Sequence, residues 1–416
     1  MNDLEFDADQ STAVNNCLDL SRRIVAVTGG PGTGKTTILK TVYEQLKDKH
    51  RSVVICAPTG KAANRIQEAT GITAMTIHRL LEYPHPGDRD EKTGKPLLTT
   101  EPRRDRHNPI DFNCVLSDEY AMVSEELHRN LLDALPPGGL IRMFGDANQL
   151  APIEQNKARQ NLPSPFVTIL NKFTSTRLLT NHRQHEGSGI VDACGRILRG
   201  VIPKVTDDFK VVRTEHPVDI ITEIIRNGNI DLRSMKNQII VPTNIGWVGT
   251  VAISALIQTI VQPNVLTGRP IERHKWSKSK SLTVCDGDKI IYCQNNYGLG
   301  LFNGDTGIVE EIDVADQITV NFGYKRVTIP PAMEVQTRRG FAIINPQKDI
   351  ELGYAITTHK AQGSEFDNVL FVMNRSRPFN LCRRNLYTGV SRARKFVQVI
   401  TDPKALSLSL YRMDQT

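Results

Sequence analysis

Short apolar runs alternate with amphipathic stretches through the first third of the chain. The runs are rich in β-branched residues, which is typical of buried parallel strands. The stretches between them have the apolar spacing of helices. The expected strands are 24–28, 53–57, 115–118 and 140–144, and the expected helices are 37–46, 61–69 and 125–134. This alternation predicts an α/β fold with a parallel sheet that binds ligands at the carboxyl ends of its strands.

Two later stretches break the alternation. Residues 83–109 are rich in proline, glycine and charge, which predicts an inserted hairpin or an exposed loop. Residues 261–350 hold short β-like runs between Gly, Asn and Asp turns, which predicts a small β-barrel insertion. Strand-like runs also lie on both sides of that insertion, at 239–242, 354–357, 369–373 and 397–401. A helix is expected at 248–260. The sequence therefore predicts a second α/β core, split by the β-rich insertion.

Composition narrows the class of protein. The 416 residues include 52 Lys and Arg against 45 Asp and Glu, and the net charge of +7 suits a polyanionic partner. The seven cysteines never have C-x-x-C spacing, which predicts reduced thiols in a cytoplasmic protein, without a zinc site or disulfides. No apolar run approaches the roughly 18 residues of a membrane helix. The acidic N-terminus lacks the apolar core of a secretory signal.

The most informative motif follows the first expected strand and reads Gly29-Gly30-Pro31-Gly32-Thr33-Gly34-Lys35-Thr36. It matches G-x-x-x-x-G-K-[ST], the phosphate-binding P-loop, and a helix is expected directly after it. Its glycines let backbone N–H groups point at phosphate oxygens, and the helix N-terminus adds partial positive charge. We expect Lys35 to reach the β- and γ-phosphates and Thr36 to hold Mg²⁺. The motif predicts that the chain binds a nucleoside triphosphate.

Two further strand ends offer candidate catalytic groups. One expected strand ends at Asp118 and Glu119, where a P-loop enzyme holds Mg²⁺ and activates the attacking water. Another is followed by Asp146 and Gln149. We expect Gln149 to contact the γ-phosphate and Asp146 to link it to the magnesium site. Acidic pairs and Gly-Asp turns also occur on surfaces without a function, so the P-loop upstream is what favours a catalytic role.

The motifs, in their order, resemble those of superfamily-1 helicases of the B type, the group that contains phage Dda and the bacterial RecD-like proteins. Gln10 in FDADQSTAV resembles the Q-motif that reads adenine. Arg183 in LLTNHRQ and Arg392 in LYTGVSRAR resemble the arginines of motifs IV and VI. The other matches are GGPGTGKTT (I), APTGKAA (Ia), TIHRLL (Ib), SDEYAMV (II), GDANQLAPI (III), VPTNIGWVGT (IVa) and YAITTHKAQGSEFDNV (V).

The resemblance implies two RecA-like P-loop domains with parallel sheets, and ATP and Mg²⁺ in the cleft between them. The implied domains are 1–82 with 110–175 (1A, which binds ATP), 83–109 (1B, a β-hairpin pin), 176–260 with 351–416 (2A) and 261–350 (2B, an SH3-like barrel). Arg183 and Arg392 are implied arginine fingers, which stabilise charge on a transferring phosphoryl group. Thr37, Gly363 and Glu365 are implied nucleotide contacts.

The resemblance also implies a groove for single-stranded DNA. The implied contacts are Pro58, Thr59, Thr76, His78, Thr243, Asn244, Thr358 and His359. Small hydroxyls and amides suit phosphate contacts that do not read sequence, and histidine rings suit stacking on bases. The chain departs from the family pattern at His182, where an aromatic residue commonly lies against adenine, and at Ala121, which replaces the serine of motif II. The segment expected to form the pin lacks Phe and Trp.

The function implied by the resemblance is ATP-dependent 5′-to-3′ translocation on single-stranded DNA and unwinding of duplex at junctions. We expect a role in replication or recombination like that of phage Dda, in the cytoplasm of a host cell. The protein is expected to be a monomer, with replication proteins as candidate partners. Two alternatives rank lower. One is a superfamily-1 RNA helicase, whose nidoviral members carry a Cys/His-rich zinc module that this sequence lacks. The other is an ATP-dependent nucleic-acid-binding switch without motor activity, against which motifs V and VI argue.

Overall fold

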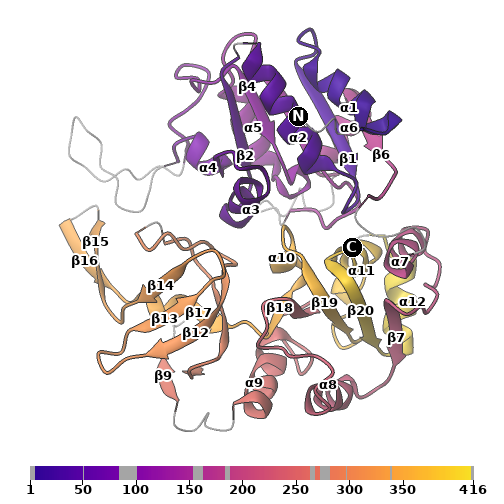
Figure 1. Ribbon diagram of the computed structural model, residues 1–416, viewed down its shortest axis with the longest axis vertical. Helices are drawn as coiled ribbons and strands as arrows, with labels where there is room; N and C mark the ends of the chain where they lie inside the picture. Colours follow the sequence, from indigo (N-terminus) through magenta and orange to yellow (C-terminus); the bar gives the residue numbers. More distant parts are fainter. Residues whose placement is uncertain are drawn as a thin grey trace. The chain divides into compact units, whose positions relative to one another are not determined.

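The computed structural model describes residues 5–49, 51–83, 101–152, 163–182, 188–262, 268–271, 282–296, 298–337 and 340–413. The chain divides into two compact units, Met1–His185 with Gln336–Gly340 and Glu186–Val335 with Phe341–Thr416. Each unit contains its own sheet of parallel strands (Figure 1). Arg183 and residues 84–100, most of the predicted pin, lie outside the described residues. No helix in the described ranges is long and apolar enough to cross a bilayer.

The described part of the first unit contains a six-stranded parallel sheet with the order β3-β2-β4-β5-β1-β6. Its strands are β1 (Ile24–Gly29), β2 (Val53–Ala57), β3 (Ala74–Thr76), β4 (Cys114–Ser117), β5 (Leu140–Gly145) and β6 (Thr174–Leu178). The helices are α1 (Ala8–Leu18), α2 (Lys35–Asp48), α3 (Gly60–Thr70), α4 (Ile77–Leu80), α5 (Glu125–Asp133) and α6 (Pro165–Lys172), with the short 3-10 helix η1 (Tyr120–Met122). The division drawn from sequence between residues 175 and 176 falls within β6.

Helices cover both faces of this sheet. Side chains alternate between the two faces along each strand. Val25 and Val27 of β1 belong to one apolar cluster with α1, α2 and α3. Ala26 belongs to a second cluster with α4, α5 and α6. Burial on both faces explains why the strands read as continuous apolar runs.

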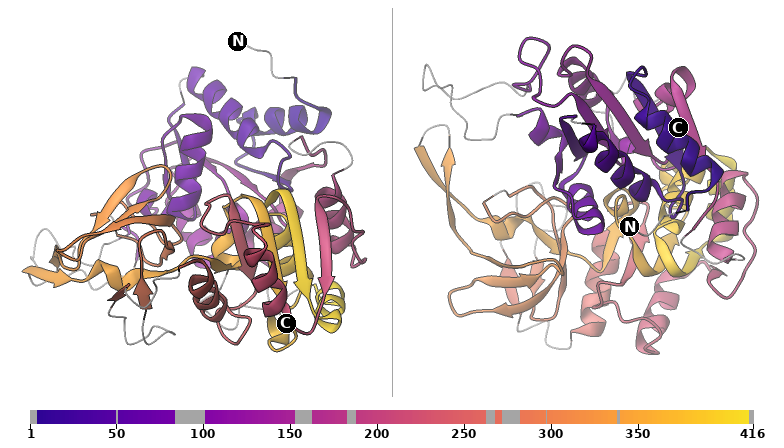
Figure 2. Two further views of the ribbon diagram at one scale, coloured as in Figure 1. Left: turned by 60° about the horizontal axis from the view of Figure 1, so that its bottom comes forward. Right: turned by 45° about the horizontal axis from the view of Figure 1, so that its top comes forward.

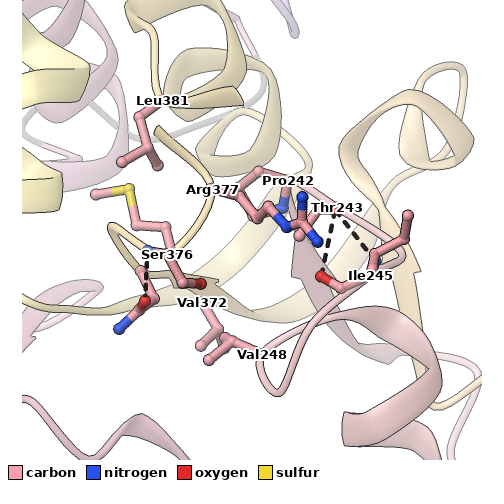
Figure 3. A pocket seen from close by; sticks show the side chains of 10 residues that line it. Pro242, Thr243, Ile245, Val248, Val372, Ser376, Arg377 and Leu381 are labelled. Carbon is pink, nitrogen blue, oxygen red and sulfur yellow. Dashed lines mark hydrogen bonds between the residues drawn. The ribbon is translucent and has the colours of Figure 1, made fainter. Parts of the chain in front are cut away.

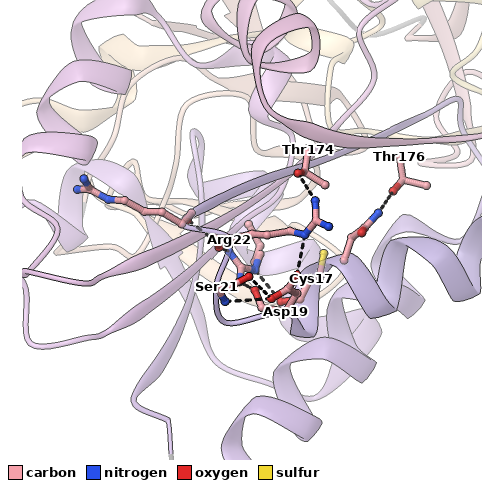
Figure 4. Close-up of polar contacts among 9 residues, drawn as sticks. Cys17, Asp19, Ser21, Arg22, Thr174 and Thr176 are labelled. Carbon is pink, nitrogen blue, oxygen red and sulfur yellow. Dashed lines mark hydrogen bonds and ion pairs between the residues drawn. The ribbon is translucent and has the colours of Figure 1, made fainter.

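A buried arginine ties α1 to the sheet. Arg142 on β5 is fully buried, and its guanidinium donates to the carbonyl oxygens of Cys17 at 2.6 Å and Asp19 at 3.0 Å. The Asp19 carboxylate accepts from Arg22, which also reaches Thr174 of β6 (Figure 4). Because the accepting carbonyls lie at the end of α1, the Arg142 side chain satisfies a helix C-terminus that lacks intrahelical donors.

The described part of the second unit has a five-stranded parallel sheet with the order β18-β8-β19-β20-β7. Its strands are β7 (Phe209–Arg213), β8 (Asn237–Val241), β18 (Ala355–Thr357), β19 (Phe366–Met373) and β20 (Ala393–Thr401). The helices are α7 (Gly189–Leu198), α8 (Pro217–Arg226), α9 (Thr250–Val261), α10 (Thr358–Ala361), α11 (Arg383–Val390) and α12 (Pro403–Tyr411), with the 3-10 helix η5 (Pro378–Asn380). α7, α11 and α12 pack with Phe371, and α8 and α9 pack with Leu370, on opposite faces. The predicted α/β fold class is confirmed.

The β-rich insertion forms an antiparallel sheet within the second unit (Figure 2). Its order is β14-β13-β12-β11-β17, with β11 (Lys289–Tyr292), β12 (Thr306–Ile312), β13 (Ile318–Asn321), β14 (Arg326–Ile329) and β17 (Ile350–Leu352). Two hydrogen-bonded strand pairs and a 3-10 helix accompany it: β9 (Arg269–Ile271) with β10 (Leu282–Val284), β15 (Met333–Thr337) with β16 (Gly340–Ile344), and η4 (Pro346–Asp349).

Buried polar contacts fix this antiparallel sheet to the parallel sheet of the same unit. Lys289 of β11 donates to the carbonyl oxygen of Asn237 on β8 at 2.7 Å. The Tyr354 hydroxyl donates to Asp288 at 2.8 Å. The insertion also has an apolar core of its own. Its predicted β-rich character is therefore confirmed, whereas the SH3-like barrel form stays a prediction.

Candidate nucleotide site and nucleic-acid interface

The P-loop joins β1 to α2 at the carboxyl edge of the first sheet. Gly32 and Gly34 have φ angles of 78° and 85°, a left-handed backbone that glycine adopts without strain. A Cβ atom on Gly29 would lie 2.5 Å from Thr33 Oγ1, so that position has no room for a side chain. Lys35 Nζ donates to the carbonyl oxygens of Gly29 and Gly30, at 2.8 Å each. The loop therefore curls around the ammonium group of its own lysine, with Thr36 and Thr37 in the first turn of α2.

The Q-motif glutamine braces the loop from α1. Gln10 is buried, and its Nε2 donates to the carbonyl oxygen of Thr33 at 3.1 Å. Its Oε1 accepts from the main-chain N–H of Asp7 at 3.2 Å, and the Asp7 carboxylate accepts from the N–H of Gln10 at 2.8 Å. This reciprocal pair is a capping box at the start of α1. The spacing Asp-x-x-Gln in the sequence is the signal that predicts this capping box.

A second brace comes from the segment after β6. The Asn181 amide donates to the carbonyl oxygen of Pro31 at 2.8 Å. The main-chain N–H of His182 donates to the carbonyl oxygen of Gly32, also at 2.8 Å. The ring Nε2 of His182 lies 2.9 Å from the Asp7 carboxylate. The pKa of Asp7 is lowered, mainly by the N–H of Gln10 and also by His182. The departure at His182 therefore has a structural role, because its side chain joins both braces.

β4 delivers two carboxylates beside the P-loop. Asp118 is buried, and its Oδ1 accepts from the N–H of Glu119 at 2.8 Å. Burial raises the pKa of Asp118 to about 6; the charge of Glu119 adds to the rise and that of Lys35 opposes it. Glu119 has a left-handed backbone with φ of 51°, and its buried Oε2 has no hydrogen-bond partner. Strained backbone and unpaired buried acceptors are features that proteins retain at functional sites.

Gln149 and Asp146 adjoin each other at the end of β5, as predicted. Both are buried, and Gln149 Nε2 lies 3.5 Å from Asp146 Oδ2. The Gln149 Oε1 is buried without a hydrogen-bond partner. The contact between the two side chains is confirmed, while their relation to a γ-phosphate stays a prediction.

The available oxygen donors fit Mg²⁺. Thr36 offers a hydroxyl and Asp118 a carboxylate, both hard ligands of the kind that Mg²⁺ takes together with phosphate oxygens and water. Across the described residues, no group of three or more His, Cys, Asp or Glu side chains is arranged to hold a metal ion. A magnesium site that uses the nucleotide's own oxygens does not need such a group.

In the first unit, two of the residues predicted to contact single-stranded DNA cap helices. The Thr59 hydroxyl accepts from the N–H of Ala62 at the start of α3, at 3.2 Å. The Thr76 hydroxyl accepts from the N–H of Arg79 at the start of α4, at 3.1 Å. His78 is exposed on α4, with its ring centroid 4.9 Å from that of Tyr83. Pro58, which precedes Thr59, is half-buried. The contacts of all four residues with phosphates or bases stay predictions.

In the second unit, a small pocket borders the carboxyl ends of β8 and β19 (Figure 3). Thr243 lines it, and its hydroxyl accepts from the N–H of Ile245 at 3.2 Å. Arg377 and Ser376 reach the same pocket from the loop after β19. Asn244 lies outside the lining and accepts from the Thr250 hydroxyl at 2.9 Å. Thr243 is therefore placed at a concave surface, whereas the Asn244 side chain stabilises the start of α9.

The predicted motif V and VI residues lie together within the second unit. The Thr358 hydroxyl is buried and donates to Asn385 Oδ1 at 2.6 Å. His359 is half-buried, and burial lowers its pKa. Arg392 is 2% exposed and donates to the carbonyl oxygens of Thr388 at 3.1 Å and Ser364 at 3.3 Å. Motif VI is thus bonded to motif V, in which Gly363 has a φ of 71° and Glu365 is half-buried.

Two family models match the chain. An AAA domain matches residues 10–155, which include the P-loop, both carboxylates and Gln149. A UvrD-like helicase C-terminal domain matches residues 352–400, which include the motif V and VI residues. The matched segments lie in the two different units.

Relatives match over most of the chain. The RecD2 DNA helicase of Deinococcus radiodurans is 30% identical over 383 residues, 89% of this chain and 46% of the relative. The RecD subunit of the RecBCD enzyme of Mycobacterium tuberculosis is 27% identical over 435 residues, 94% of this chain and 69% of the relative. The chain thus spans about half the length of the first relative.

The fold is similar to that of Pif1. A crystal structure of Bacteroides Pif1 bound to single-stranded DNA aligns with a TM-score of 0.60 and 20% identity, covering 95% of this chain and 92% of that one. The two matched domains, the RecD relatives and the order of the motifs make the chain similar to RecD-like helicases of superfamily 1, and the likeness to Pif1 concerns the fold.

Proposed function

We propose that this protein is an ATP-dependent DNA helicase of the Dda type, which moves 5′ to 3′ along single-stranded DNA and unwinds duplex. The observation that carries the proposal is the pair of carboxylates beside the P-loop. Asp118 lies in the field of Lys35, and the neighbouring Glu119 keeps an unpaired buried oxygen. An acceptor in this position suits a water molecule that must lose a proton as it attacks phosphorus.

The chemistry divides among residues of both units. Residues 29–37 bind the phosphates, Gln10 contacts the base, and Thr36 and Asp118 hold Mg²⁺. When bound, the ion neutralises charge on the phosphate oxygens. Glu119 accepts the proton of the attacking water, and Gln149 contacts the γ-phosphate. The remaining proposed roles are charge stabilisation by Arg183 and Arg392, and nucleotide contacts by Gly363 and Glu365.

Strand binding uses sequence-independent contacts. We assign phosphate or base contacts to Pro58, Thr59, Thr76, His78, Thr243, Asn244, Thr358 and His359. The division into domains 1A, 1B, 2A and 2B with the boundaries given above is part of the same proposal. So are a monomeric state, a cytoplasmic location and a role in phage replication or recombination.

Strand displacement tests the proposal. Purified protein with ATP and Mg²⁺ is given matched duplexes that carry either a 5′ or a 3′ oligothymidine tail. Unwinding confined to the 5′-tailed duplex is the expected result, and unwinding confined to the 3′ tail would reverse the polarity. The Glu119→Gln variant should bind ATP but neither hydrolyse it nor unwind.

ATPase stimulation separates the alternatives. Oligothymidine should stimulate hydrolysis more than an RNA of equal length. Stronger stimulation by RNA would favour an RNA helicase. Hydrolysis that responds to neither nucleic acid would favour a switch without motor activity.

A further inference from the structure

Lys360 connects the predicted strand-binding segment to the β-rich insertion. It follows His359 in α10, next to β18 of the parallel sheet. Its Nζ lies 3.5 Å from Oε2 of Glu351 on β17 and 3.1 Å from Sγ of Cys293, which follows β11. Glu351 lies on β17, a strand of the antiparallel sheet, and Cys293 directly follows β11, so this sheet holds a side chain of motif V.

The charges show that this contact is an ion pair. Burial alone lowers the pKa of Lys360, but Cys293 and Glu351 outweigh it and the pKa is raised. Burial raises the pKa of Cys293 to about 11, so its sulfur is a neutral thiol and a weak acceptor at neutral pH. Glu351 is therefore the anionic contact of the ammonium group.

The geometry makes the pair exchangeable. The Lys360 and Glu351 side chains are 27% and 35% exposed. The 3.5 Å separation exceeds the roughly 2.7–2.9 Å of a good charge-assisted hydrogen bond. Glu351 can regain water if the lysine leaves, because its carboxylate already faces solvent. A partly exposed pair of this kind contributes little free energy and gives way to a stronger anion.

We propose that Lys360 contacts a backbone phosphate of the bound strand and that Glu351 competes with the strand for it. The β-rich insertion thereby sets the affinity of motif V for single-stranded DNA. The inference rests on the proposed function and assigns the insertion a role in it. Binding exchanges one ion pair for another, and no covalent step is involved.

Equilibrium binding of a fluorescein-labelled oligothymidine to the full chain, without nucleotide and at several salt concentrations, tests the exchange. Glu351→Gln should tighten binding by about two- to fivefold. Glu310→Gln is the matched control, because it removes the same charge from the same insertion where the carboxylate pairs with Arg326; it should change the affinity much less. Lys360→Ala should weaken binding about tenfold and reduce the salt slope by about 0.7.

The double variant decides between exchange and long-range charge. In the Lys360→Ala background, Glu351→Gln should no longer tighten binding. Persistence of the effect there, or equal effects of Glu351→Gln and Glu310→Gln, would overturn the inference. If Lys360→Ala folds poorly, the two glutamate variants alone still decide it. A wild-type chain that neither binds oligothymidine nor unwinds would contradict the proposed function instead.

Discussion

The two units share a design, a parallel sheet with polar residues at its loops, but they differ in which buried polar atoms lack partners. Near the P-loop of the first unit these atoms include two that can only accept, Glu119 Oε2 and Gln149 Oε1, beside the Ser117 hydroxyl, which can also donate. Beside motifs V and VI of the second unit they are Asn385 Nδ2, a donor, and the Ser364 hydroxyl, which can donate. Acceptors suit a cation or the protons of water, and donors suit an anion.

The difference also extends to the charged groups. In the first unit, the pKa of buried Asp118 is raised and Glu119 has a strained backbone. In the second unit, the guanidinium of Arg392 is satisfied by Thr388 and Ser364. An unpaired buried group costs about 1–3 kcal/mol. Unpaired buried atoms therefore carry this cost in both units. The first unit adds to it a buried carboxyl group with a raised pKa, whereas the main cation of the second unit has its hydrogen-bond partners within that unit.

Lys35→Ala should have the largest effect. It removes the ammonium that lies among the P-loop oxygens, and with it both phosphate binding and charge stabilisation, so we expect ATP hydrolysis to fall by more than about 10⁴-fold. Steady-state phosphate release with saturating oligothymidine measures it. Lys47→Ala, an exposed position in the last turn of the same helix, should hydrolyse ATP normally. Retained hydrolysis in Lys35→Ala would remove the P-loop from the mechanism.

Arg392 tests whether the satisfied cation of the second unit also acts in catalysis. Arg392→Lys keeps a charge but loses the planar fork, so we expect turnover to fall about 10³-fold with little change in nucleotide affinity. Phosphate release and binding of a fluorescent nucleotide separate the two quantities. Arg394→Ala, exposed two residues later, is the control. Unchanged turnover in Arg392→Lys would leave Arg392 a purely structural link between Thr388 and Ser364.

The central strands could be predicted from sequence because both of their faces are buried. The predicted run 53–57 coincides with β2, and the predicted run 24–28 lies within β1. The edge strands β6 and β7 were missed. β6 reads Thr-Ser-Thr-Arg-Leu with alternating exposure, so it lacks the continuous apolar run that identifies a buried strand.

The candidate site shows the same division. The P-loop and the two carboxylates follow from local spelling, because each motif is contiguous. The contacts of His182 with Asp7 and of Lys360 with Glu351 and Cys293 join segments that only the folded chain brings together. No sequence pattern specifies such pairs. The resemblance names positions for contact with DNA, but it does not say which of their hydroxyls are already hydrogen-bonded within the fold. The Thr358 hydroxyl is one of these, because it donates to Asn385.

Asp118 tests the cost carried by the first unit. Its folded pKa of about 6 lies above the unfolded value of 3.8, so the folded state binds more protons between these values, and stability falls as the pH rises through that window. Asp118→Asn mimics the neutral form. It should raise the melting temperature of the ligand-free protein at pH 7 by about 2 °C, and by less at pH 5, while abolishing hydrolysis. Equal melting of both proteins at pH 7 would contradict the assigned cost.

His182→Ala should have the smallest effect. The substitution removes the contact with Asp7 but keeps the main-chain bond to Gly32, so the P-loop retains one brace. Nucleotide affinity, measured by titration with a fluorescent ADP analogue, should fall only about two- to threefold, as expected for loss of a partly exposed polar contact. His216→Ala, on an exposed side chain of the second unit, should leave it unchanged. A loss beyond tenfold would mean that the His182 ring contacts the nucleotide itself. The first unit would then use this side chain for binding as well as for bracing, and its contrast with the second unit would sharpen.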